Sequence, residues 1–228
     1  MMASPVYDHV PKQSHFNRGA VVFKDLDPAP MFPFPVAEAR PLAFADLDAD
    51  LNDYDAFAAK LDTARGDAPA LIGGYGEDRA IYAAGEIFGD VEPRSIHLGV
   101  DVWTRAGTGI RAPLDGSVHS FAVNDNFGDY GATIVLAHAL PGRAPFCTLY
   151  GHLSNDSLDG LRVGTPIARG ESFARLGEPH ENGGWPPHLH VQAIIDMMDK
   201  RGDFPGVAAR SEREYWLGMC PDPRDLLV

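Results

Sequence analysis

Three kinds of feature are scarce in this chain, and each scarcity excludes a class of protein. Only two cysteines, Cys147 and Cys220, occur among 228 residues, so no disulfide framework is possible. We expect both to be free buried thiols, although a single bridge between them also agrees with the sequence. Lysine and arginine number 19 against 32 aspartates and glutamates, a formal net charge of -13. This shortage of positive charge argues against nucleic acid or an anionic membrane surface as a partner.

Long apolar runs are also missing. No segment approaches the roughly 20 consecutive apolar residues of a membrane-spanning helix. The N-terminal residues include Asp8, His9, Lys12 and His15, where a secretory signal would have an apolar core. The sequence therefore predicts a cytoplasmic protein without a membrane span, and leaves export by another route open.

The first 80 residues differ in pattern from the rest. Residues 1–45 are rich in proline and show no lasting periodicity, which predicts an extended arm that lies on the domain or is partly disordered. Three aromatic side chains of the arm favour docking: Phe32, Phe34 and Phe44. Residues 50–65 repeat apolar side chains at three- and four-residue steps, which predicts a helix. We therefore assign 1–80 to an arm and helix that pack on a core formed by 81–228.

From about residue 94 the pattern changes to short strands separated by glycine-containing turns. The 24 glycines and 19 prolines of the chain favour strands over helices. The expected strands span residues 116–123, 131–139, 145–152 and 188–195. The sequence thus predicts a mainly β fold, an antiparallel sheet or sandwich with an open groove for a metal site, to which the arm and helix are added.

Four histidines and one aspartate in this region have the chemistry of a zinc hydrolase site. They occur in three pieces, His97-Leu98-Gly99-Val100-Asp101, Tyr150-Gly151-His152-Leu153 and His188-Leu189-His190. Zinc in hydrolases usually takes three protein ligands and leaves a fourth position for water. His97, Asp101 and one histidine of the last piece can fill the three positions. Two histidines are then left for proton transfer.

Strand geometry supports this grouping. Side chains alternate along a strand, so His188 and His190 project from the same face. His97 and Asp101 would lie ~13 Å apart if fully extended at ~3.3 Å per residue, which is too far for two ligands of one ion. The segment must therefore bend, and Gly99 gives the backbone that freedom.

Several other residues near these pieces allow two interpretations. His152 ends a predicted strand, where a turn can aim it into a groove. Tyr150 either adds a hydrogen bond to the site or packs as an ordinary strand aromatic. Trp185 either borders the groove or packs in the core. The pair His180-Glu181 begins an HExxH motif, but Gly184 stands where the second histidine is required, so we reject that motif.

The order and context of the three pieces resemble the lysostaphin-type zinc metallopeptidases. The motifs of that family are HxGxD, a histidine at the end of a YxHL-like strand, and HLH. The turn at 112–116 resembles its AP-x-x-G turn, and 130–134 resembles its middle strand. The resemblance covers about residues 94–195. It implies hydrolysis of a peptide, such as a peptidoglycan fragment, with one zinc ion per chain.

The resemblance also implies a role for each residue. His97, Asp101 and His190 would bind zinc. His188 and His152 would flank the attacking water, His188 as general base and His152 as stabiliser of the tetrahedral oxyanion. The residues expected to line the substrate groove are Tyr150, Trp185 and Asn182.

The chain departs from the secreted members of that family. No signal peptide or wall-binding domain is recognisable, and the approach to HLH is Glu181-Asn182-Gly183-Gly184-Trp185-Pro186-Pro187. Together with the runs at 202–207 and 221–223, this resembles a subgroup in which a similar segment is fused to aminotransferase and phosphotransferase-like domains. The substrate is therefore either a peptidoglycan-type peptide or a small peptide or amide in the cytoplasm.

Two other functions agree with parts of the pattern. A catalytically inactive zinc-containing module, blocked by the N-terminal arm, would keep the same ligands. A non-haem iron oxygenase also uses two histidines and one carboxylate. Its carboxylate usually lies two residues from the histidine, not four, and it has no use for His152 and His188. A cupin-like binding module is disfavoured because no glutamate follows HLH at the expected spacing.

Overall fold

The computed structural model describes residues 23–47, 53–79 and 92–228. Its strands are β1 (Arg40–Pro41), β2 (Leu71–Gly73), β3 (Arg94–His97), β4 (Val100–Trp103), β5 (Gly109–Arg111), β6 (Gly116–Asn124), β7 (Gly131–His138), β8 (Phe146–Leu153), β9 (Pro166–Ile167), β10 (Ser172–Arg175), β11 (His188–Ile194) and β12 (Val207–Ala209). Its α-helices are α1 (Tyr54–Arg65) and α2 (Arg213–Met219), and its 3₁₀ helices are η1 (Val36–Glu38), η2 (Phe44–Leu47), η5 (Asn155–Leu158), η6 (Arg210–Glu212) and η7 (Arg224–Leu226).

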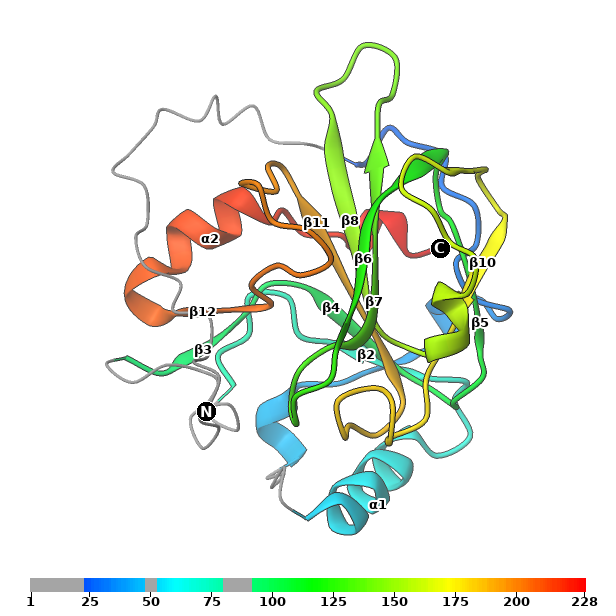
Figure 1. Ribbon diagram of the computed structural model, residues 1–228. Helices are drawn as coiled ribbons and strands as arrows, with labels where there is room; N and C mark the ends of the chain where they lie inside the picture. Colours follow the sequence, from blue (N-terminus) through cyan, green and yellow to red (C-terminus); the bar gives the residue numbers. More distant parts are fainter. Residues whose placement is uncertain (1–22, 48–52, 80–91) are drawn as a thin grey trace.

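An eight-stranded sheet in the order β1-β2-β4-β11-β8-β7-β6-β9 runs through the middle of the molecule (Figure 1). Its neighbours pair antiparallel, except that β1 and β2 are parallel. The remaining strands form two separate two-stranded sheets, β10 with β5 and β12 with β3. The predicted mainly β, antiparallel fold is confirmed, and the four expected strands correspond to β6, β7, β8 and β11 within one or two residues.

Strand β11 is buried on both faces, and the two faces differ in chemistry. Leu189 and Val191 are fully buried in the main apolar core. The residues of the opposite face are polar, and none of them is more than 3% exposed: His188, His190 and Gln192. Buried polar groups are costly unless they are hydrogen-bonded or bind a metal. These three polar side chains of β11 therefore need hydrogen-bond partners or a metal ion.

The described part of the N-terminal arm docks on the core. Phe32 is buried and stacks on the partly buried Phe34 with 5.2 Å between ring centroids. Phe44 is buried as well, so docking is confirmed for the arm from residue 23 onward, while residues 1–22 lie outside the described residues. Strands β1 and β2 also come from the segment before residue 80 and belong to the main sheet. The domain boundary at residue 80 stays a prediction.

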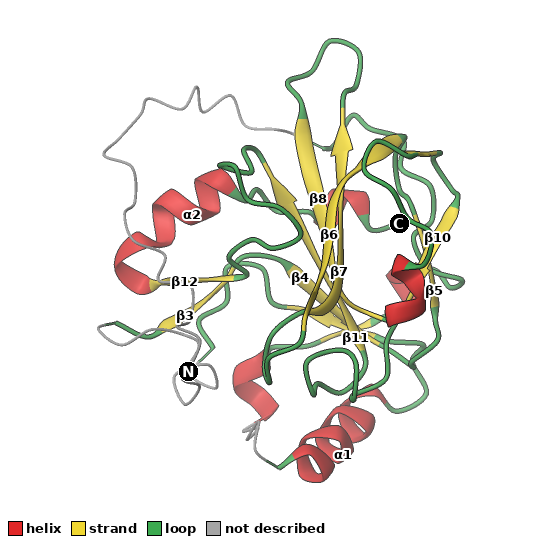
Figure 2. Cartoon of the chain, viewed as in Figure 1, coloured by secondary structure: helices red, strands yellow, loops and turns green. Residues whose placement is uncertain are grey.

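Helix α1 confirms the helix expected from the apolar repeat over residues 54–65; residues 50–52 lie outside the described part of the chain. Asp53 caps it by accepting a hydrogen bond from the backbone nitrogen of Ala56 at 3.0 Å. Its buried Phe57 packs edge-on against Trp103, with ring centroids 5.6 Å apart. Figure 2 shows α1 below the strands of the sheet, where it contacts β2. The helix thus supports a tryptophan that contacts the predicted site.

The two cysteines are free thiols, as expected, with Cys220 buried and Cys147 partly buried. Burial raises the pKa of Cys147 to about 11, which keeps its thiol protonated. Within the described residues, the helices are too short or too polar to cross a membrane.

Candidate metal centre

The structure brings the three predicted ligands together from three strands. His97 ends β3, Asp101 lies in β4, and the β11 register places His190 directly opposite Asp101. The Nε2 atom of His97 lies 3.0 Å from Nδ1 of His190. Oδ1 of Asp101 lies 3.1 Å from the same Nδ1 and 3.4 Å from Nε2 of His97. The predicted bend between His97 and Asp101 occurs at Gly99.

The hydrogen-bond partners determine which ring nitrogens carry hydrogen. Nδ1 of His97 lies 2.9 Å from the carbonyl oxygen of Gly74, which can only accept, so Nδ1 is the donor. Nε2 of His190 lies 3.0 Å from Oε1 of Gln192. The amide nitrogen of Gln192 donates to the carbonyl of Pro205 at 3.0 Å, which fixes the orientation of that amide. Both histidines therefore turn an unprotonated nitrogen toward the carboxylate.

This donor set fits a zinc ion. Tetrahedral zinc with bonds of about 2.0–2.1 Å separates its ligand atoms by about 3.3 Å. The three donor atoms here are 3.0, 3.1 and 3.4 Å apart. All are electron-pair donors with no hydrogen between them, so a cation between them satisfies all three at once. Two imidazoles and one carboxylate are also ligands that zinc accepts.

Burial and charge keep these groups in the protonation states that a metal requires. Burial, reinforced by the positive charge of Arg79, lowers the pKa of His97 to about 4, so this imidazole is neutral near pH 7. Burial alone would raise the pKa of Asp101. The positive charge of Arg79, whose Nη1 lies 2.6 Å from Oδ2 of Asp101, holds that pKa well below its ordinary value. A neutral imidazole and an ionised carboxylate are the forms that bind a metal.

The two remaining histidines lie side by side next to this cluster. The ring centroids of His152 and His188 are 4.0 Å apart. Nδ1 of His188 donates to the carbonyl of Pro186 at 2.9 Å, and Nδ1 of His152 donates to the carbonyl of Asn182 at 2.8 Å. Each therefore presents an unprotonated Nε2, and that of His188 lies 3.9 Å from Oδ1 of Asp101. Burial lowers the pKa of His188 to about 4, so it is a proton acceptor near neutral pH.

His152 reaches the cluster because its backbone is left-handed, with φ at 61°. Tyr150, two residues earlier, lies opposite Val191 in the register and is fully buried in the main apolar core. Its hydroxyl accepts a hydrogen bond from Thr148 at 3.0 Å, and its ring packs edge-on against Phe173. The prediction that Tyr150 lines the substrate groove is therefore wrong, because strand alternation places it on the core side of the sheet.

The other two expected groove residues support the histidines. Trp185 is 5% exposed, and its ring contacts His152 and His188 edge-on, with centroids 6.0 and 5.9 Å apart. Asn182 is fully buried, and its amide exchanges two hydrogen bonds of 3.0 Å with the backbone of Trp185. The groove prediction is wrong for Asn182, because this side chain holds the turn that orients His152.

The residues of the centre are buried, and the open groove that we expected stays a prediction. None of its five side chains exposes more than 5% of its surface: His97, Asp101, His152, His188 and His190. Trp103 stacks on His188 with centroids 3.7 Å apart, and sequence reasoning missed this contact. Because Phe44 and Phe57 pack on Trp103 from behind, the arm and α1 form one wall of the centre.

Position 99 requires a glycine because a larger side chain would not fit there, and not because the backbone needs unusual freedom. A Cβ at this position would lie 2.6 Å from Cε1 of His190 and 2.7 Å from the carbonyl oxygen of Val191. We expect Gly99→Ala to displace His190, weaken zinc binding and lower the free energy of unfolding by about 1–3 kcal/mol. Denaturant unfolding and zinc titration measure both effects. Gly218→Ala is the matched control, because a Cβ there meets no atom within 4 Å. Wild-type stability and zinc affinity in Gly99→Ala would contradict this account.

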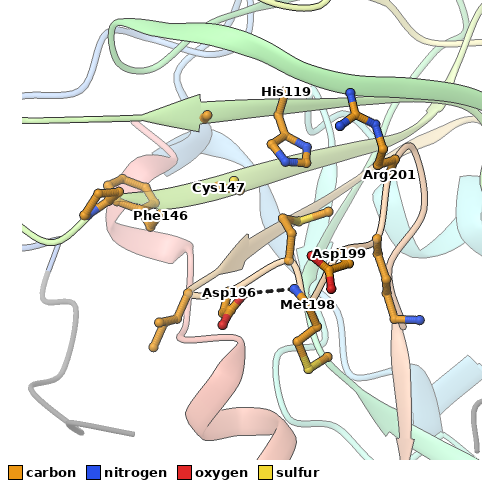
Figure 3. Close-up of a pocket in the computed structure, with 12 residues that line it drawn as sticks. His119, Phe146, Cys147, Asp196, Met198, Asp199 and Arg201 are labelled. Carbon is orange, nitrogen blue, oxygen red and sulfur yellow. Dashed lines mark hydrogen bonds between the residues drawn. The ribbon is translucent and has the colours of Figure 1, made fainter.

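A separate pocket of about 390 Å³ lies at the far ends of the same strands (Figure 3). Cys147 at the start of β8 and Ile195 just after β11 line it, whereas the metal centre uses the opposite ends of these strands. Asp196 accepts a hydrogen bond from the backbone nitrogen of Met198 at 2.8 Å, so this carboxylate stabilises the turn of its own loop. No residue of the metal centre lines this pocket.

Comparison with known proteins identifies the domain. The sequence model of Peptidase family M23 matches residues 95–200, which include all five residues of the centre. Residues 95–200 belong to peptidase family M23. An uncharacterized metalloprotease of Haemophilus influenzae is 34% identical over 100 residues, which are 44% of this chain and 19% of that protein. The chain thus matches about a fifth of the length of this curated relative.

Three solved structures of bacterial proteins are among those similar to this chain. A zinc-containing peptidase from Vibrio cholerae is 25% identical and covers 51% of this chain and 34% of its own, with a TM-score of 0.36. Lysostaphin from Staphylococcus simulans is 20% identical and covers 68% and 47%, with a TM-score of 0.38. The catalytic domain of the M23 protein EnpA from Enterococcus faecalis is 19% identical and covers 60% and 92%, with a TM-score of 0.40.

Proposed function

We propose that this protein is a zinc-dependent metallopeptidase that hydrolyses a peptide amide bond. The observation that carries the proposal is the convergence of three electron-pair donors, from His97, Asp101 and His190, at 3.0–3.4 Å with no hydrogen between them. Membership of residues 95–200 in peptidase family M23 supports the same chemistry. We assign these three side chains as the ligands of one zinc ion per chain.

The remaining residues of the centre then have distinct tasks. Bound zinc would supply a Lewis acid that polarises the scissile carbonyl and lowers the pKa of a water molecule. His188 accepts the proton of the attacking water at Nε2, because its Nδ1 hydrogen is held by the carbonyl of Pro186. His152 also presents an acceptor Nε2, and after taking up a proton from solvent as negative charge develops it would donate a hydrogen bond to the oxyanion. Both rings are fixed by backbone carbonyls, so little reorganisation accompanies the reaction.

For the substrate we propose a short peptide, either a peptidoglycan fragment or a small cytoplasmic peptide. Enclosure of the centre by Trp103 and Trp185 supports a short chain over a polymer. Hydrolysis of muropeptides and of synthetic tri- to pentapeptides, followed by mass spectrometry, tests this assignment. We expect cleavage of at least one class, loss of cleavage after metal removal with a chelator, and recovery with zinc. Cleavage that persists without metal would contradict the proposal.

A catalytically inactive zinc module is the second candidate, and the same enclosure of the five side chains favours it. The two candidates differ in one result. Both require tight zinc binding, but only the peptidase cleaves peptides. Deleting residues 1–45 would not separate them, because Phe32 and Phe44 are buried and their loss would damage the fold. A zinc-bound protein that cleaves nothing in the peptide panel would favour the inactive module.

A further inference from the structure

Arg79 lies outside the M23 match and yet contacts the metal centre directly. Its side chain is 1% exposed. Nη1 lies 2.6 Å from Oδ2 of Asp101, and Nε lies 2.8 Å from Oε2 of Glu77. The guanidinium thus joins two carboxylates, and it engages the oxygen of Asp101 that faces away from the histidines.

The two oxygens of Asp101 have different partners, the histidines for Oδ1 and Arg79 for Oδ2. Oδ1 lies 3.1 Å from Nδ1 of His190 and 3.4 Å from Nε2 of His97. Oδ2 is held by a charge-assisted hydrogen bond from a rigid, planar group. A carboxylate held in this way offers one oxygen, and not two, to a metal.

The position of Arg79 is itself fixed by its surroundings. Its guanidinium carbon lies 4.5 Å from the ring centroid of Phe44. A Cβ at Gly74 would lie 1.8 Å from Nη2, so the backbone of Gly74 closes the space beside it. The carbonyl of that glycine also accepts the hydrogen bond from Nδ1 of His97. One short segment, 74–79, therefore orients two of the three proposed ligands.

We propose that Arg79 is a positioning residue that restricts Asp101 to single-oxygen ligation and so keeps a coordination position open for substrate. This inference rests on the proposed zinc-dependent function. Outer partners of metal ligands commonly change metal affinity by roughly 10–100-fold when they are removed. A residue that only neutralised the buried Asp101 would affect affinity without changing the coordination number.

The test compares Arg79→Met and Arg79→Lys with the wild-type protein. Zinc affinity is measured by competition with a chromophoric chelator, and the coordination number by the visible absorption of the Co²⁺-loaded protein. We expect zinc affinity to fall roughly 10–100-fold in Arg79→Met. We also expect weaker cobalt absorption, because a second oxygen of Asp101 raises the coordination number. Zinc affinity and cobalt absorption should also fall in Arg79→Lys, since lysine lacks the planar guanidinium that spans both carboxylates.

Arg210→Met is the matched control. Nε of Arg210 lies 2.6 Å from Oδ2 of Asp78, next to Arg79 in the sequence, but this side chain is exposed. Arg210→Met should therefore leave the zinc affinity and the cobalt spectrum unchanged. Wild-type zinc affinity and an unchanged cobalt spectrum, in whichever Arg79 variant folds, would overturn the inference. Weaker zinc binding with an unchanged cobalt spectrum would also contradict it, because the role would be electrostatic only. Failure of the wild-type protein to bind zinc would overturn the proposed function as well.

Discussion

Replacing His188 or His152 with alanine should abolish most peptide hydrolysis while zinc stays bound. Neither ring belongs to the group of three converging donors, and each offers an acceptor Nε2 beside it. General acid–base groups of this kind typically contribute about 10²–10⁴-fold to the rate. We therefore expect kcat to fall by roughly that factor in each variant, with zinc content equal to that of the wild-type protein.

His119→Ala is the control for this pair. His119 lines the separate pocket, and its Nδ1 lies 2.8 Å from the hydroxyl of Ser120. Its loss should change neither hydrolysis nor zinc content. Full hydrolysis by His188→Ala would show that the general-base assignment is wrong. Loss of zinc from that variant would instead make His188 a ligand.

His190→Ala and Asp101→Ala should each lose zinc. Removing a ligand weakens metal binding more than removing an outer partner does, so we expect affinity to fall more than about 100-fold in both. The two variants should differ in stability. Asp101→Ala leaves the buried Arg79 without this carboxylate, and breaking a buried ion pair costs about 3–5 kcal/mol. His190→Ala is therefore the cleaner test of ligation.

Chelator competition and denaturant unfolding of the metal-free proteins measure these two effects separately. Zinc binding by His190→Ala within tenfold of the wild-type value would remove His190 from the ligand set. Equal unfolding free energies for the metal-free wild-type and Asp101→Ala proteins would show that the Arg79–Asp101 pair contributes little to the fold.

The strands and the ligand cluster were predictable because their signals are local. Alternation along 188–195 gave β11, and the same alternation placed His188 and His190 on one face. The bend between His97 and Asp101 followed from the reach of an extended chain. Arg79 could not be found in this way, since it contacts Asp101 across 22 residues and belongs to no repeating pattern.

The errors share a cause in tertiary packing. Tyr150 and His152 are two residues apart in one strand, which would place both on one face, but the left-handed backbone of His152 separates them. Asn182 lies three residues before Trp185, and its amide forms both hydrogen bonds of the turn instead of facing a groove. The stacking of Trp103 on His188 could not be predicted either, because no local pattern indicates this contact.

The most direct test of the account is the metal content of the protein, measured by mass spectrometry after purification without chelators or metal-affinity resin. We expect one zinc ion per chain in the wild-type protein and none in His190→Ala. Wild-type protein that stays free of metal even after titration with zinc would contradict it.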